Sequence, residues 1–430
     1  MDLTVSRAPG SQLATDVVVD VDLAVLEADP YPVYAWLREN CPIAYVPQTG
    51  RVFVTTWDLC DEAGNNDEVF EPAKDLFNTV YGDPNVISLN GPAHRDLRNA
   101  INPPFRPRAV AGYRETLLRS TARRYLEQIR SQGRAEASSE ILEPISQRTV
   151  GDILGFTDVP DTTLSRWFHD YGDYLVDFGR SDEVAQRGRA AKADVMAYLK
   201  RRIPGVLAAP ADSPGSAGSA GSAGSAGSAG SAGSAGSALS HMLHDGMPEG
   251  QTRSVEDLIG SFGVLIVGGF QEPAHGIANT LVGLLGRPEQ AARFAADPAA
   301  WSTRAMDEGL RWLAPFGMTE KVLRTDATLS GLLFPAGTEV GLMIGSANRD
   351  PARFDDPDVF DLDRPPRTHV SFGYGTHFCI GHSFARVLGQ VVLEEMFTML
   401  PGLRLDPDRP PVLHGWAFRG AKTLPLVWDA

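Results

Sequence analysis

Cys379 is the residue whose surroundings most clearly point to chemistry. It lies in a glycine-rich stretch, S-F-G-Y-G-T-H-F-C-I-G-H over residues 371–382, directly before a segment with apolar residues at helical spacing. Glycines let such a loop turn tightly and approach a flat ligand closely. The positive end of the following helix dipole favours the anionic thiolate. A thiolate offered in this way suits an axial ligand of haem iron, where its electron donation favours cleavage of an O–O bond.

A simpler interpretation is that a lone cysteine acts as a small buried hydrophobe. The pattern F-G-x-G-x-H-x-C-x-G, from Phe372 to Gly381, argues against it because all its defined positions match together. The stretch resembles the cysteine-ligand loop of the cytochrome P-450 superfamily. The resemblance implies a mainly α-helical fold with small β sheets, in which a triangular helical prism encloses haem b.

The composition excludes several classes of protein. With 39 basic and 54 acidic residues, the net charge of −15 argues against nucleic acid as the main partner. The three cysteines are too few and too scattered for a disulfide framework, an iron–sulfur cluster or a CxxC zinc site. No signal peptide is evident, and the longest nearly apolar run, 258–270, falls short of the ~20 residues that a membrane helix needs. We therefore expect a soluble cytoplasmic protein with no membrane partner.

The N-terminal part predicts a small sheet between irregular segments. Residues 1–28 are expected to be loose, with order beginning at Asp29. Short β-prone runs at 43–45 and 52–55, around a turn with Pro and Gly, predict a hairpin. Residues 71–91 show little periodicity and predict a long irregular segment.

Long amphipathic helices are predicted over 119–147 and 161–203. After them, residues 212–238 consist largely of a Gly-Ser-Ala repeat, which lacks the apolar side chains needed to offset the entropy of ordering. This composition predicts a flexible linker between two helices. Because helices with the same apolar patterning stand on both sides of it, we expect residues 1–430 to form a single domain.

The longest helical pattern runs from Ser254 to Leu285, and Ser254 and Asp257 match a capping box at its start. The middle of this helix, V-G-G-F-Q-E-P-A over 267–274, breaks helix rules. Glycines lower helix stability, and a proline removes a backbone N–H and clashes with the preceding turn. We expect a kinked segment here, and such local conflicts are commonly functional.

Gln271 and Glu272 occupy the centre of that segment. The resemblance implies an acid followed by an alcohol at these positions, which together deliver protons during dioxygen activation. A carboxyl group one residue later can still donate a proton if burial raises its pKa. The simpler interpretation is that both side chains only repair hydrogen bonds that the proline breaks.

Several residues are candidate contacts of the haem. His94 and Arg98 stand at i and i+4 on a predicted helix, a pair that alone is typical of a solvated face. The resemblance implies that they bind the haem propionates, since two cations suit two carboxylates. It also implies propionate contacts at Lys321, where many members carry arginine, and at His369, as well as a haem contact at Phe372.

A second charged set is expected to be structural. Glu308 and Arg311 share a helical face at i and i+3. The resemblance implies that they form a salt-bridge cluster with Arg364 behind the haem. Farther along, residues 333–340 predict a strand, a turn and a second strand.

Three stretches narrow the resemblance: 239–253, 268–285 with its Q-E-P-x-H-G core, and 415–420. They are similar to the bacterial guaiacol and syringol O-demethylase group, which also carries Gln-Glu in place of the acid and alcohol. The resemblance implies that the following residues line the pocket of the phenolic ring: Tyr81, Leu175, Val264, Gly268, Thr319 and Phe418.

Some pocket positions carry further implications. Tyr81 and Leu175 stand where the guaiacol enzyme has phenylalanines, and Leu175 would leave room for a second methoxy group. Gly268 would provide space and a backbone partner for the phenolic hydroxyl. Glu320, next to Thr319, is an unexpected charge that would suit a polar substrate group if it faced the haem.

These features predict a haem-thiolate monooxygenase that O-demethylates a methoxyphenol-type aromatic to a catechol-type product and formaldehyde. Cys379 would ligate the iron, and Gln271, Glu272 and Gly268 would form the catalytic distal set. The resemblance implies dioxygen as oxidant and an NADH-dependent reductase with flavin and iron–sulfur centres. Two alternatives stay open: a peroxygenase that uses hydrogen peroxide on the same substrates, and a non-catalytic haem sensor or carrier.

Overall fold

The computed structural model describes residues 4–7, 17–176, 181–208 and 236–430. Contacts within the chain group it into two compact units. The first unit comprises Met1–Ala73, Ala122–Glu143 and Glu272–Ala430, and the second comprises Lys74–Thr121 and Pro144–Gln271. Helices dominate both units, which confirms the predicted fold class of a mainly α protein with small sheets. The single domain over 1–430 stays a prediction.

The regular elements in the described part of the second unit are all helices. Its helices are α4 (Lys74–Tyr81), α5 (Gly91–Ile101), α6 (Pro107–Tyr113), α8 (Glu143–Leu154, from its second residue), α9 (Asp161–Val176), α10 (Asp182–Ala208), α11 (Ala238–His244) and the first part of α12 (Val255–Leu285). The helices of the first unit are α1 (Leu23–Ala28), α2 (Tyr31–Asn40), α3 (Trp57–Asn65), α7 (Ser120–Ile129, from its third residue), the rest of α12, α13 (Pro288–Ala296), α14 (Pro298–Trp312), α15 (Ile344–Ala347) and α16 (His382–Met399).

The described strands all belong to the first unit. They are β1 (Thr4–Arg7), β2 (Val17–Asp20), β3 (Ile43–Val46), β4 (Arg51–Val54), β5 (Phe70–Pro72), β6 (Arg134–Glu136), β7 (Thr319–Leu323), β8 (Ala327–Leu329), β9 (Leu332–Phe334), β10 (Glu339–Leu342), β11 (Arg404–Leu405), β12 (Val412–His414), β13 (Gly420–Thr423) and β14 (Pro425–Val427).

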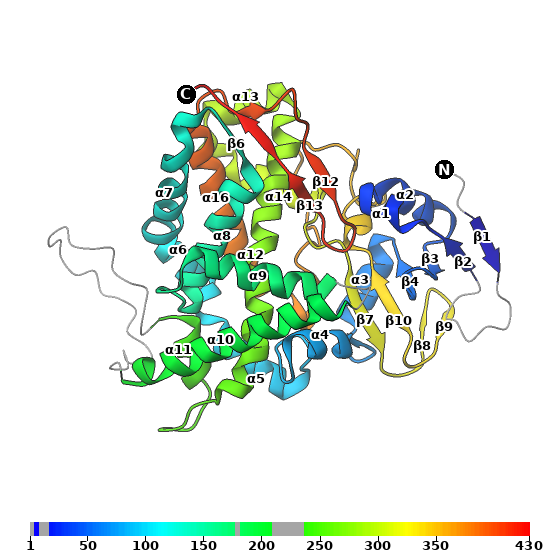
Figure 1. Cartoon of the computed structure of the whole chain (residues 1–430). Coiled ribbons are helices and arrows are strands. Elements are labelled where there is room, and N and C mark those ends of the chain that lie inside the picture. Colours follow the sequence, from blue (N-terminus) through cyan, green and yellow to red (C-terminus); the bar gives the residue numbers. More distant parts are fainter. Residues whose placement is uncertain (1–3, 8–16, 177–180, 209–235) are drawn as a thin grey trace. The chain divides into compact units, whose positions relative to one another are not determined.

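The largest sheet has the strand order β1-β2-β3-β4-β10-β7-β5. Strands β3 and β4 pair antiparallel, with Ile43 opposite Val54, which confirms the predicted hairpin. Strand β10 joins β4 in parallel and β7 in antiparallel fashion, so a segment from the C-terminal half completes the N-terminal sheet (Figure 1). Three smaller sheets have the orders β11-β14-β6, β12-β13 and β8-β9.

Both strands predicted over 333–340 are present as β9 and β10. They do not pair with each other, since β9 pairs with β8, whereas β10 pairs with β4 and β7. The turn at Ser330 and Gly331, with φ of 50° and 78°, closes the β8–β9 hairpin instead. The positive φ at Gly331 suits a residue without a side chain.

The prediction of a loose N-terminus was wrong for residues 17–28. Strand β2 pairs with β3, and helix α1 begins after Asp22, whose side chain accepts a hydrogen bond from the Ala24 N–H at 2.9 Å. Val19 and Leu26 are completely buried in the core that these elements share with α2. Burial of such side chains offsets the ordering entropy of the segment.

Two further segments differ from their predictions. The irregular stretch over 71–91 contains the end of β5 and helix α4, because Phe77 and Tyr81 stack on one side of that helix. The long helix predicted over 119–147 is broken into α7, β6 and α8. Gly133, with φ of 68° after a turn of 3₁₀ helix, ends the first piece, since a left-handed backbone favours glycine.

Helix α12 begins and ends where the sequence predicts, and the kink at Pro273 stays a prediction. The Ser254 hydroxyl and the Asp257 N–H and carboxylate hydrogen-bond one another, which forms the predicted capping box. The boundary between the two units falls inside this helix, after Gln271. In the described residues, no helix is sufficiently long and apolar to cross a membrane.

Helix α12 packs closely against α14 within the first unit. A Cβ added at Gly309 of α14 would lie 1.9 Å from the Thr280 hydroxyl oxygen of α12. A Cβ at Gly389 of α16 would meet the Met306 sulfur of α14 at 2.3 Å. Glycine at these crossings therefore sets the spacing of the three helices.

Most of the predicted linker over 212–238 lies outside the described residues. Its last residues are described: Ser237 caps α11, and its hydroxyl accepts a hydrogen bond from the Ser240 N–H at 3.3 Å. The end of the repeat therefore serves as a helix start.

Candidate functional site

The cysteine loop presents one thiol differently from the others. Cys379 is partly exposed, whereas Cys41 and Cys60 are buried. Burial raises the pKa of the Cys60 thiol, which donates a hydrogen bond to the Val54 carbonyl. The Cys379 N–H donates to the Phe372 carbonyl at 2.8 Å, and helix α16 begins at His382, three residues later. Only a partly exposed thiol can reach a ligand, so the structure favours Cys379 for that role.

The loop is anchored by α3 and the residues after it. A Cβ at Gly64 would lie 2.4 Å from the Tyr374 ring, so the missing side chain makes room for that tyrosine. The Asp67 carboxylate accepts a hydrogen bond from the Thr376 N–H at 2.8 Å. These contacts fix the turn that precedes Cys379 from one side.

Lys321 lies on β7 and contacts the same aspartate. Its Nζ is 3.3 Å from Asp67 Oδ1 and 3.4 Å from the Phe70 carbonyl oxygen. Burial lowers the pKa of this ammonium, and Asp67 opposes that shift. Asp67 therefore links β7 to the cysteine loop, and the propionate contact at Lys321 stays a prediction.

The Arg386 side chain contacts both His369 and Phe372. Arg386, on α16, places its guanidinium 4.4 Å from the Phe372 ring centroid and 3.4 Å from His369 Nε2. Arg386 Nε donates to Asp307 at 2.8 Å, and His369 Nε2 lies 3.8 Å from the same carboxylate. Burial lowers the pKa of His369, so the ring is neutral in this setting. The sequence singled out both residues but missed the arginine that orients them.

In the second unit, α5 carries His94 and Arg98. The His94 side chain is completely buried and Arg98 is half-buried, which excludes the solvated helical face as their setting. Their spacing along α5 places both side chains on one face of the helix. Contact of either residue with a propionate stays a prediction.

The distal pair lies at the end of the second unit and the start of the first. Both Gln271 and Glu272 are partly buried, and Glu272 Oε2 is fully covered, with no hydrogen-bond partner among the described residues. Burial raises the pKa of Glu272 to about 7. One turn earlier, a Cβ at Gly268 would meet no heavy atom within 4 Å. A carboxyl group with a pKa close to 7 is partly protonated at neutral pH, so it can both donate and accept a proton.

Four predicted pocket residues belong to the second unit. Tyr81 of α4 lies against α12, because a Cβ at Gly263 would be 2.9 Å from the Tyr81 ring. The rings of Tyr81 and Tyr171 are 6.2 Å apart, and Leu175 follows Tyr171 by one turn of α9. Val264 is next to Gly263 on α12. The structure thus brings Tyr81 against α12 near Gly263, and Tyr171 is a neighbour of Tyr81 that the sequence did not single out as a site residue.

Thr319 and Phe418 belong to the first unit. The Phe418 ring lies 5.4 Å from that of Phe316, and the two residues form an isolated β-bridge. Thr319 follows three residues after Phe316, and its hydroxyl is covered without a partner among the described residues. The sequence did not single out Phe316, because its pairing with Phe418 joins segments that are far apart in the chain.

Glu320 does not share a face with Thr319. Side chains alternate along β7, and Glu320 Oε1 pairs with Arg51 Nη2 of β4 at 3.1 Å. Burial raises the pKa of Glu320, and Arg51 opposes that shift. A cation from the same sheet therefore accounts for the charge of Glu320, and the polar substrate group that Glu320 would suit stays a prediction.

The Glu308 cluster forms as predicted. Arg311 donates to both Glu308 oxygens, at 2.8 and 2.7 Å, and Arg364 Nε lies 3.0 and 3.1 Å from them. The Asp361 N–H donates to Glu308 at 2.9 Å. The carboxylate is therefore fully paired, which fits a structural role.

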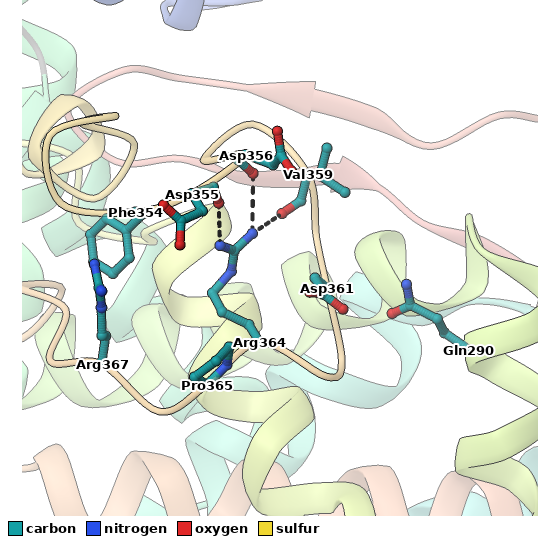
Figure 2. Close-up of a pocket in the computed structure, with 9 residues that line it drawn as sticks. All are labelled: Gln290, Phe354, Asp355, Asp356, Val359, Asp361, Arg364, Pro365 and Arg367. Carbon is teal, nitrogen blue, oxygen red and sulfur yellow. Dashed lines mark hydrogen bonds between the residues drawn. The ribbon is translucent and has the colours of Figure 1, made fainter.

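A cavity of about 290 Å³ lies beside this cluster (Figure 2). Figure 2 shows Arg364 donating to the carbonyl oxygens of Asp355, Asp356 and Val359. Because its central cation is already paired with Glu308 and these carbonyls, the cavity is a poor candidate for the active site.

The residues present fit a thiolate-ligated haem. The loop offers one accessible thiol at a helix N-terminus, where a thiolate is stabilised. Cys379 would hold the iron, and Phe372 and Arg386 would support the loop.

Comparisons with known proteins agree with this geometry. The family model described as cytochrome P-450 matches residues 303–401, which contain the Glu308 cluster and the cysteine loop. The biotin biosynthesis cytochrome P-450 of Bacillus subtilis is 27% identical over 80% of this chain and 80% of its own. The steroid C26-monooxygenase of Mycolicibacterium smegmatis is 27% identical over 97% of this chain and 98% of its own.

A solved structure extends the likeness to the fold. Ligand-free cytochrome P-450 TbtJ1 superposes with a TM-score of 0.79 at 23% identity, over 94% of this chain and 99% of that chain.

Proposed function

Because the chain belongs to the cytochrome P-450 superfamily, whose members bind haem through a thiolate-ligated iron, we propose that this monooxygenase O-demethylates a methoxyphenol-type aromatic. Substrates of the syringol or guaiacol class would give a catechol-type product and formaldehyde. The observation that carries the proposal is the covered, unpartnered carboxyl oxygen of Glu272 in the middle of α12.

The reaction balances with one oxygen atom inserted into a methyl C–H bond. Haem, when bound, supplies the oxidation. With dioxygen, a redox partner provides two electrons, and the second oxygen atom takes up two protons and leaves as water. The hydroxymethyl ether then breaks its C–O bond, which yields the phenol and formaldehyde. The electrons would come from NADH through a flavin and iron–sulfur reductase.

Glu272 is proposed as the proton-handling group. Its pKa of about 7 means that the neutral form dominates below pH 7 and the carboxylate above it. A group poised near the working pH can both give and take a proton. Gln271, beside it, would donate and accept hydrogen bonds without a charge, and Gly268 would leave room for the substrate.

The pocket is proposed to hold a flat ring. In the second unit, Tyr81, Leu175 and Val264 are its proposed contacts. In the first unit, Thr319 and Phe418 are proposed contacts, and the Phe418 ring lies beside that of Phe316. An aromatic ring pair 5.4 Å apart offers stacking to an aromatic substrate.

A peroxygenase reaction is a second candidate, and Glu272 is the observation that favours it. A carboxylate can take a proton from hydrogen peroxide and return it to the departing oxygen. The overall change, in which the methyl ether and hydrogen peroxide give the phenol, formaldehyde and water, needs no external electrons.

The test measures formaldehyde from syringol and guaiacol, with a steroid as comparison substrate for the class named in the relatives. Each is assayed with NADH plus reductase and, separately, with hydrogen peroxide. We expect Glu272→Gln to lower formaldehyde release by about 10²-fold or more. It should also remove the pH dependence near 7.

Glu143→Gln is the matched control, because burial also raises the pKa of that glutamate to about 7. Unchanged turnover in Glu272→Gln would remove Glu272 from the mechanism. No formaldehyde from either methoxyphenol under both regimes would refute O-demethylation. A shift of the Soret band on substrate binding without any product would indicate a sensor or carrier.

A further inference from the structure

Arg386 lies where helices α14 and α16 pack against each other. A Cβ at Gly389 of α16 would meet the Met306 sulfur of α14 at 2.3 Å, so the two helices approach closely at this point. One turn before Gly389, Arg386 donates from Nε to the Asp307 carboxylate at 2.8 Å. Burial alone would raise the pKa of Asp307, but its contacts with His369 and Arg386 lower that pKa below its usual value. The carboxylate is therefore charged and can direct the guanidinium.

The same guanidinium reaches both ends of the cysteine loop. Its Cζ lies 4.4 Å from the centroid of the Phe372 ring, a distance at which a cation is attracted to an aromatic ring. Nη2 lies 3.4 Å from His369 Nε2, and Nη1 lies 3.3 Å from His382 Nδ1. One cation thus contacts residues that precede Cys379 and a residue that follows it.

His369 is not the group that orients Arg386. The Ser371 N–H donates to His369 Nδ1 at 3.3 Å, so the proton of the neutral ring is on Nε2. Nε2 then faces the guanidinium as a second donor and cannot accept a hydrogen bond from it. The direction of the guanidinium must therefore come from its other contacts, and the charged acceptor among them is Asp307.

Phe372 is joined to Cys379 through the backbone. The Phe372 carbonyl oxygen accepts a hydrogen bond from the Cys379 N–H at 2.8 Å. A shift of Phe372 would lengthen or break this bond and so release the backbone of the thiol residue. On the other side of the loop, Asp67 accepts from the Thr376 N–H, so the loop has two anchors.

We propose that Asp307 and Arg386 are a positioning pair for Cys379: Asp307 directs the guanidinium onto the Phe372 ring, and Phe372, held in this way, fixes the backbone of Cys379 in its iron-binding position. The inference rests on Cys379 as the haem ligand and not on the proposed substrate.

The chain offers a matched control for this pair. Arg293 of α13 also binds a carboxylate, that of Asp363, at 2.6 Å. Its guanidinium also lies over an aromatic ring, 4.6 Å from the centroid of Trp301. Both sets therefore combine an ion pair with a cation–ring contact, but only the Arg386 set contacts the cysteine loop.

The experiment follows the long-wavelength Soret band of the reduced carbon monoxide complex of the holoenzyme, because this band requires the thiolate ligand. Its rate of loss is measured in urea at a concentration below the unfolding transition of every variant. Arg386→Gln should lose the band about fivefold faster than the wild type, as expected for the loss of a partly buried cation–ring contact. Arg386→Lys should give an intermediate rate, because lysine keeps the charge but not the planar group. Arg293→Gln should match the wild type.

A double-mutant cycle tests the order of action. Asp307→Ala should also accelerate loss of the band. Combined with Arg386→Gln it should add nothing, because no guanidinium remains to be directed. In a Phe372→Leu background, Arg386→Gln should likewise have no further effect, because the ring through which it acts is absent.

An Arg386→Gln rate equal to that of Arg293→Gln would overturn the inference, as would an unchanged rate in Asp307→Ala. Additive effects of the two substitutions would overturn it as well, because the side chains would then act independently. Far-UV circular dichroism gives the urea midpoint of global unfolding for each variant. If the rates of band loss only followed those midpoints, the pair would be merely structural and the inference wrong.

The readout needs no substrate. Failure of the O-demethylation assay would therefore leave this inference standing, whereas absence of the long-wavelength band in the wild type would overturn it together with the assignment of Cys379 as the haem ligand.

Discussion

Replacement of Glu308 by glutamine should cost a large share of the stability of the first unit. Glu308 and Arg311 expose only 5% and 2% of their side chains, and Arg364 exposes 11%. The substitution keeps the shape but leaves two largely buried guanidinium groups without their shared carboxylate. Breaking a buried ion pair in this way costs about 3–5 kcal/mol.

That cost converts into a measurable melting shift. A chain of 430 residues has an unfolding entropy of about 0.8–0.9 kcal/mol per degree near its melting temperature. The Tm of Glu308→Gln should therefore fall by about 3–6 °C, as measured by differential scanning calorimetry of the holoenzyme.

Asp363→Asn is the control for this prediction. Its carboxylate binds Arg293 at 2.6 Å through both oxygens, which is shorter than the Glu308 contacts, but both side chains are exposed. Solvent screening should leave its Tm within about 1 °C of the wild type. If the Tm of Glu308→Gln fell by no more than that of the control, burial of the ion pair could not be the source of the cluster's stabilising effect.

Two further changes test other parts of the molecule. Asp67→Asn should destabilise the holoenzyme by on the order of 1 kcal/mol, because Thr376 and Lys321 lose an ionic acceptor. The pKa of Asp67 lies below the usual 3.8. In denaturant titrations, the stability that Asp67→Asn loses should therefore be constant above pH 3.8 and should vanish as the pH falls through the lowered pKa. A loss of stability that persists at lower pH would refute the ionic explanation. Tyr171→Phe should leave the denaturation midpoint equal or raised, because the hydroxyl is covered without a partner among the described residues, whereas a clear loss of stability would reveal a partner.

Sequence reasoning succeeded where local chemistry is strict. The capping box of α12, the β3–β4 hairpin and the Glu308 cluster each depend on residue types at short, fixed spacings. Such spacings leave few alternative geometries, so a pattern is sufficient to predict them.

Sequence reasoning failed where a distant partner decides the structure. The N-terminal residues 17–28 look weakly patterned, and only the core formed with α2 and β3 makes their order favourable. The charge of Glu320 is explained only by the fold, which places Arg51 of β4 beside it. Likewise, nothing near Lys321 in the chain reveals that Asp67 is its partner.

The same dependence on distant partners explains why two stretches of the chain belong together. The segment G-W-A-F-R-G over 415–420 and the helix segment with His275 are far apart in the sequence. A side chain at position 420 would collide with the imidazole, and Asn279 binds the carbonyl of the residue before it. At Gly415, φ is 93° and a Cβ would lie 1.8 Å from the Phe418 carbonyl oxygen, so this turn also requires glycine. The C-terminal loop is therefore built around α12, and a side chain at position 420 should be tolerated only together with a smaller residue at position 275.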